Sequence, residues 1–274
     1  MSEPIEQSGL LQLSGFSFPV YASAQSEHSA TVIAQRCERA HQFLSDLFGV
    51  SPSIVLYVLS SQDWSSYTSN PTYGMPHFSW FGRKLVVASE PGDFWHGLID
   101  IIQQNVPDRY EQLRQIYGRN NQDIDLSPFF DLLVVHELGH AFQHAGSCQF
   151  PRLWLMELYA NLCLQAYIET VEAEHLPLLE TFPAAMRQLN PSLFEHHSLA
   201  DFEELYSDVG PINYVWYQAF LHKAAAHTYA AGNVQALQQL WRTFRVSDAQ
   251  LLTVLEQQVH PVFAQIPQNW ASGL

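Results

Sequence analysis

The pattern of apolar residues predicts strands and helices in the first part of this 274-residue chain. Between residues 30 and 48 the apolar side chains recur at helical intervals, which predicts an amphipathic helix that Gly49 ends. Continuous apolar runs at 53–59 and 84–88 predict buried strands. A short strand is expected near 16–21. This part of the chain therefore predicts a small sheet packed with helices.

The rest of the pattern is almost entirely helical, with breaks at Asn190-Pro191 and Gly210-Pro211. The predicted helices cover residues 97–117, 127–146, 153–173, 176–189, 201–206, 211–231, 234–244 and 247–259. Strands and helices together predict the α+β class, with a small sheet and helices in the N-terminal half and a mostly helical C-terminal half.

One predicted helix carries the motif His-Glu-Leu-Gly-His at residues 136–140, after an apolar run at 129–135. His136 and His140 are one helical turn apart, about 40° around the axis, so both imidazoles can reach one metal ion. Glu137 is placed to contact a water on that metal rather than the metal itself. A mostly buried helix would not carry these three side chains without partners, because unpaired buried polar groups are costly. The alternative interpretation is a pair of core histidines with satisfied hydrogen bonds.

A zinc site of this kind needs a third protein ligand and leaves the fourth position open for water. Glu157 is the candidate, because it lies 17 residues after His140 in a helical run with apolar surroundings. Asn161 shares its helix face. His144 falls about 80° from His136 around the helix, which predicts a histidine beside the site or on the surface. The alternative interpretation of Glu157 is a solvated side chain.

Over roughly residues 126–165 the chain resembles the gluzincins, the zinc metallopeptidases related to thermolysin and to a large family of zinc aminopeptidases. The resemblance is carried by the two histidines and two glutamates described above, which are His136, Glu137, His140 and Glu157. Asn161 stands where the family often has a polar residue that steadies the first histidine. The resemblance implies a zincin-like fold and hydrolysis of peptide bonds.

The resemblance also implies how the chain is divided. It predicts an α/β half at 1–145 that carries the metal helix and a helical half at 146–274 that carries the third ligand, with the metal between them. In such folds the strand that borders the cleft holds an extended substrate through its backbone. Residues 84–89 are the candidate for this edge strand, and an ordinary inner strand is the alternative.

Zinc with two histidines, one glutamate and a water matches the thermolysin-type ligand set. The ion lowers the pKa of its water toward about 7, and Glu137 is the predicted general base that takes the proton and later returns it to the leaving amine. The oxyanion at the attacked carbonyl needs a second donor, which gluzincins take from a tyrosine or histidine in the helical half. Tyr214, in the first turn of a helix that begins at Pro211, is the predicted donor. The other candidates are Tyr206, Tyr217, His222 and His227.

Composition and charge limit the classes of binding partner and the cellular compartment that are expected for this protein. The net charge of −15 argues against nucleic acid or an anionic membrane, since both bind basic patches. The three cysteines, Cys37, Cys148 and Cys163, cannot all pair and lack the spacing of metal ligands. The first six residues do not resemble a signal peptide, and no apolar run reaches 18 residues. A cytoplasmic protein is therefore expected.

The sequence thus predicts a zinc metallopeptidase that acts on a peptide or protein substrate. Two alternatives stay open. One is a zincin-like interaction protein without catalysis, and the other is a zinc hydrolase of non-peptide amides. The oligomeric state is not predicted.

Overall fold

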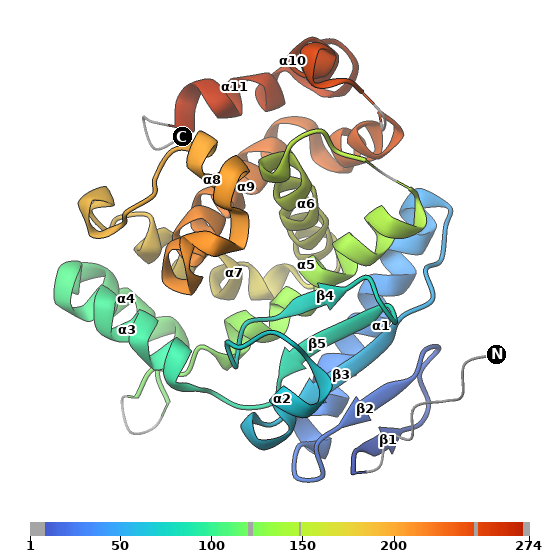
Figure 1. Cartoon of the computed structure of the whole chain (residues 1–274), viewed down its shortest axis with the longest axis vertical. Coiled ribbons are helices and arrows are strands. Elements are labelled where there is room, and N and C mark those ends of the chain that lie inside the picture. Colours follow the sequence, from blue (N-terminus) through green and yellow to red (C-terminus); the bar gives the residue numbers. More distant parts are fainter. Residues whose placement is uncertain (1–8, 120–122, 148, 244–245, 271–274) are drawn as a thin grey trace.

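The computed structural model describes residues 9–119, 123–147, 149–243 and 246–270. Its sheet has five strands in the order β1-β2-β3-β5-β4 (Figure 1). They are β1 (Leu11–Leu13), β2 (Val20–Ala22), β3 (Val55–Leu59), β4 (His77–Ser79) and β5 (Lys84–Ala88). The three inner strands run parallel, whereas β1 and β4 are antiparallel to their neighbours.

The edge of the sheet differs from the sequence prediction. Residues 84–89 are not at the edge, because β5 pairs with β3 on one side and with β4 on the other. The edge strand is β4, for which the sequence pattern predicts no strand. Its three half-buried residues are too few to give a signal of alternating polarity. The strand expected at 16–21 is the shorter β2.

Among the described residues, five helices belong to the same part of the chain as the sheet. They are α1 (Glu27–Phe48), α2 (Ser61–Tyr67), α3 (Asp93–Asn105), α4 (Pro107–Tyr117) and α5 (Ser127–Ala145). α3 and α4 replace the single helix expected at 97–117. Val106 separates them with φ −140° and ψ 65°, because the residue before a proline is forced out of the helical region.

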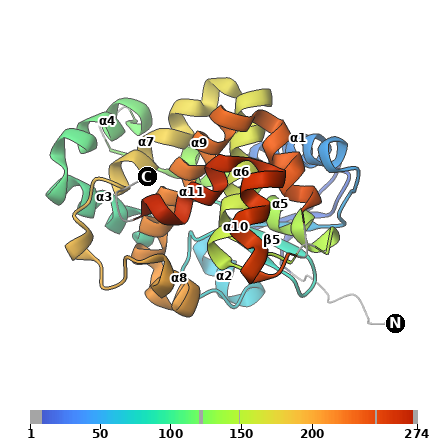
Figure 2. The ribbon, with the colours of Figure 1, turned by 90° about the horizontal axis from the view of Figure 1, so that it is seen from above.

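Beyond α5 the described chain is helical, as predicted. The helices are α6 (Leu153–Val171), α7 (Leu176–Met186), α8 (Leu199–Leu205), α9 (Pro211–Arg242), α10 (Leu251–Val254) and α11 (Pro261–Asn269). Asn233, with φ 51°, interrupts α9 where the sequence predicts a break between two helices. A π-helical turn at Leu255–Val259 and α11 pack on α9 (Figure 2). The sequence pattern does not predict α11.

Helix α5 joins the two parts of the molecule. It contacts α1, β4 and β5 on one side and α6 and α7 on the other, and α6 packs in turn on α9 (Figure 1). Most of its residues are buried, as its apolar sequence predicts. The prediction of an α+β chain with a small sheet and mostly helical content is confirmed.

Within the described residues, no helix is both long and apolar enough to cross a membrane. Cys37 and Cys163 are buried free thiols. Cys148, Phe244 and the first eight residues lie outside the described part of the chain.

Candidate metal centre

The start of α5 is fixed by side-chain contacts to its first residue. Leu126 occupies the N-cap position, and Ser127 is the first residue of the helix. Asp125 instead accepts hydrogen bonds from the amide of Ser127 at 2.9 Å and from its hydroxyl at 2.6 Å. Pro128 follows in the first turn, where its missing N–H is not needed. From this start, the third and fourth turns of the helix carry the two histidines.

A close approach between α5 and α6 brings the third candidate ligand to the histidines. A Cβ on Gly139 would lie 3.1 Å from Cα of Ala160, so any side chain at this position would push the helices apart. Glu157 precedes Ala160 by about one turn, and Asn161 follows Glu157 by one turn on the same face. The glycine of the motif therefore allows Glu157 to reach the two histidines.

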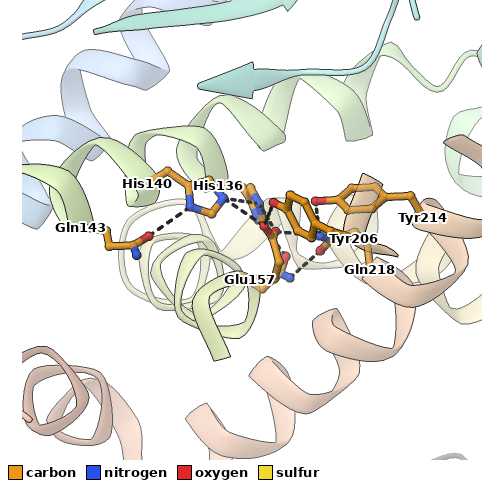
Figure 3. Close-up of polar contacts among 8 residues, drawn as sticks. His136, His140, Gln143, Glu157, Tyr206, Tyr214 and Gln218 are labelled. Atoms are coloured by element: carbon orange, nitrogen blue, oxygen red, sulfur yellow. Dashed lines mark hydrogen bonds and ion pairs between the residues drawn. The ribbon is translucent and has the colours of Figure 1, made fainter. Parts of the chain in front are cut away.

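The three candidate ligands meet in one buried group (Figure 3). Nε2 of His136 lies 3.2 Å from Nε2 of His140 and 3.2 Å from Oε2 of Glu157. Nε2 of His140 lies 3.6 Å from Oε1 of Glu157. Ligands about 2.0–2.1 Å from a tetrahedral zinc ion are separated by roughly 3.4 Å. This group of two imidazoles and one carboxylate therefore fits a metal ion of that size.

Each histidine also has an amide partner on its other ring nitrogen. Oδ1 of Asn161 lies 3.0 Å from Nδ1 of His136, and Oε1 of Gln143 lies 3.4 Å from Nδ1 of His140. An amide oxygen accepts a hydrogen bond from Nδ1–H, and in this tautomer Nε2 keeps its lone pair for a metal. Asn161 thus lies against the first candidate ligand, and Gln143, which the sequence analysis does not single out, lies against the second. The feature of the sequence that could have pointed to Gln143 is its position three residues after His140, which places both side chains on one helix face.

Two side chains from the helical half donate to the carboxylate of Glu157. The hydroxyl of Tyr206 donates to Oε1, and the Gln218 amide donates to Oε2 at 2.7 Å. The same amide nitrogen of Gln218 donates to the hydroxyl of Tyr214 at 2.8 Å. Asn161 donates from Nδ2 to Oε1 of Gln218 at 2.8 Å. Figure 3 shows Tyr206, Tyr214 and Gln218 of this network on one side of the two histidines.

The electrostatics of the group follow from burial and from mutual attraction. Burial alone would lower the pKa of His140, but the carboxylate of Glu157 outweighs this and raises that pKa to about 9. Burial opposes ionisation of Glu157, yet His140 and His136 hold its pKa well below the usual value. Burial, followed by the nearby Glu157, raises the pKa of both Tyr206 and Tyr214. Both phenols therefore keep their hydroxyl hydrogens at pH 7.

The group opens into a cleft of about 800 Å³ between the sheet part and the helical part. His136, Glu137 and His140 line it, and no described residue forms a hydrogen bond to the Glu137 carboxylate. From the helical part, Tyr206, Tyr214, Gln218 and His222 also line the cleft. The edge strand β4 contributes His77 and Phe78. An aromatic wall, defined here as Phe94, Phe129, Phe130 and Phe182, lies toward the start of α5.

The remaining candidates fall into two groups. His222 lies in the cleft against Phe129, and burial lowers its pKa to about 3, so the ring is neutral at pH 7. His144 is exposed and packs edge-on against Trp80, as expected for a histidine outside the site. Tyr217 donates to the carbonyl of Ser198, away from the cleft. His227 is exposed and does not line the cleft.

No family model, no curated protein and no solved structure matches this chain. Its function must therefore be inferred from the chemistry of the site.

Proposed function

We propose that this protein is a zinc-dependent metallopeptidase of the gluzincin type with a zincin-like fold. The observation that carries the proposal is the convergence of His136, His140 and Glu157 at separations that suit a tetrahedral zinc ion. A purely structural zinc site is closed by four protein ligands. Here three described ligands meet beside the carboxylate of Glu137, at the wall of a cleft.

In the proposed mechanism, zinc in this site supplies Lewis-acid polarisation of a carbonyl and lowers the pKa of a water toward about 7. Glu137 accepts the proton of the attacking water and returns it to the leaving amine. The hydroxyl of Tyr214 donates a hydrogen bond to the oxyanion that forms at the attacked carbonyl. Its raised pKa keeps the phenol protonated for this role.

The cleft lining supports an extended peptide as substrate. β4 pairs only with β5 within the described sheet, so its other edge leaves backbone groups for pairing with an added chain. His77 and Phe78 of this strand line the cleft. The aromatic wall offers apolar surface for a large side chain next to the cleaved bond. β4 thus takes the role that the sequence gives to residues 84–89.

The test compares wild type with Glu137→Gln on a broad peptide library, with zinc content measured in both proteins. Glutamine keeps the shape of the side chain but cannot accept the proton. We expect about one zinc per chain in both, cleavage by the wild type, and a loss of about three orders of magnitude or more in the variant. Equal cleavage by both proteins would exclude this mechanism. Zinc without cleavage by the wild type would favour an interaction protein.

A further inference from the structure

Gln218 contacts two groups that the proposed reaction needs, the candidate ligand Glu157 and the candidate oxyanion donor Tyr214. Its amide nitrogen lies 2.7 Å from Oε2 of Glu157 and 2.8 Å from the hydroxyl oxygen of Tyr214. Tyr214 lies one turn before Gln218 on α9, so both side chains project toward the same wall of the cleft.

The direction of the amide is set by a chain of hydrogen bonds that starts at a metal ligand. If Nε2 of His136 is to bind a cation, Nδ1 must carry the proton and donate to Oδ1 of Asn161. The NH2 group of Asn161 then faces Oε1 of Gln218 at 2.8 Å. The NH2 group of Gln218 is thereby turned toward Glu157 and Tyr214. The reversed amide would place its oxygen against the carboxylate.

The orientation of the Gln218 amide affects where the hydroxyl hydrogen of Tyr214 points. The two N–H groups of Gln218 are used by Oε2 of Glu157 and by the phenol oxygen. Since the phenol oxygen accepts a hydrogen bond from Gln218, the hydrogen of Tyr214 points away from that amide. Apart from that amide, the Tyr214 hydroxyl contacts the hydroxyl of Tyr206, which donates its own hydrogen to Glu157. A negatively charged substrate oxyanion in the cleft would be a stronger acceptor for the Tyr214 hydrogen than this neutral phenol oxygen.

We infer that Gln218 is a positioning residue that holds the Glu157 carboxylate toward the metal and aims the Tyr214 hydroxyl at the substrate. The inference rests on the proposed function, and it links α5, α6 and α9 through Asn161. Loss of a partner that orients a metal ligand lowers metal affinity by about 10–100-fold. Loss of the contact to Tyr214 lowers kcat and leaves KM unchanged, because the phenol acts in the transition state.

The first experiment measures the affinity for Zn2+ by competition with a chelator in wild type, Gln218→Met and Gln218→Glu. We expect both variants to bind Zn2+ about 10–100-fold more weakly. Gln218→Glu keeps the size of the side chain but replaces its donor with an oxygen, so it separates donation from packing. Gln235→Met, at an exposed position of α9, is the control and should bind like wild type.

The second experiment measures kcat at saturating Zn2+ for Gln218→Met with and without Tyr214→Phe. We expect about a tenfold loss in the wild-type background and a clearly smaller loss when the phenol is already absent. Equal losses in both backgrounds would overturn the role toward Tyr214.

Zinc affinity within twofold of wild type in both Gln218 variants would overturn the role toward Glu157, while the proposed function would stand. A wild type that binds no Zn2+ would overturn both proposals.

Discussion

Two buried glutamates at opposite ends of α6 differ in whether a permanently charged group is among their partners. Glu172, directly after α6, forms ion pairs with Arg36 at 2.8 Å and with Arg39. The hydroxyl of Tyr167 donates to it at 2.7 Å. Glu157, in the first turns, instead contacts two imidazoles, a phenol and an amide. Both side chains are almost fully buried.

The difference lies in where the compensating positive charge comes from. Guanidinium groups are always charged, so the protein itself balances Glu172 and needs nothing further there. The partners of Glu157 carry no permanent charge, and an ionised carboxylate is costly to bury unpaired. The negative charge of the Glu157 carboxylate must therefore be balanced by a protonated histidine or by a bound cation. A buried carboxylate among neutral donors beside a cleft is therefore a stronger sign of a metal site than burial alone.

The largest effect expected from this comparison is on zinc binding. Glu157→Gln removes the anionic ligand. It should lower zinc affinity by more than the ~100-fold that is lost when a residue supporting a ligand is removed. His136→Ala or His140→Ala should abolish zinc binding. Glu172→Gln, a matched change on the same stretch of chain, should keep full zinc occupancy. Metal analysis after dialysis against a weak chelator measures both. Full zinc occupancy in the Glu157→Gln variant would show that Glu157 is not the third ligand. His144→Ala should retain zinc.

A smaller effect is expected from the tyrosines that meet near Glu157. Tyr214→Phe should lower kcat by about two orders of magnitude with little change in KM, because its hydroxyl acts in the transition state. Tyr206→Phe should instead weaken zinc binding, since its hydroxyl donates to the carboxylate of Glu157. Steady-state kinetics and zinc titration of both variants decide between these roles. A kcat loss confined to Tyr206→Phe would transfer the oxyanion role to Tyr206.

The smallest effect concerns stability at the other glutamate. Burial opposes ionisation of Glu172, but Arg39 and Arg36 hold its pKa at about 2, below the ordinary 4.5. Its contribution to folding is therefore fully present above about pH 4.5 and is lost as the pH falls toward 2. Glu172→Gln should cost roughly 2 kcal/mol at pH 7, less than a fully buried pair because Arg39 is 49% exposed. Urea unfolding at several pH values measures this. A cost that stays constant down to pH 2 would contradict the ion-pair account.

Much of the metal helix could be predicted from sequence because its geometry is local. A helix places residues four apart on one face, so the spacing of His136 and His140 sets their relation before any tertiary contact forms. The apolar run before them predicts a buried helix, and α5 is buried. Glu157 could be proposed because its helix has a continuous apolar pattern, which predicts that the side chain faces the core.

The other parts of the site depend on contacts between distant segments. Gln218 lies 61 residues from Glu157 and Tyr206 lies 49 residues from it, and neither spacing follows from a helical or strand period. β4 is the edge of the sheet although β5 follows it in the chain, because strand order is set by pairing and not by sequence order. The sequence by itself determined which helix presents the two histidines, since that depends on a repeat of 3.6 residues. Tertiary structure decided which groups surround Glu157, since that depends on the close packing of α5, α6 and α9, where Gly139 lets two backbones meet.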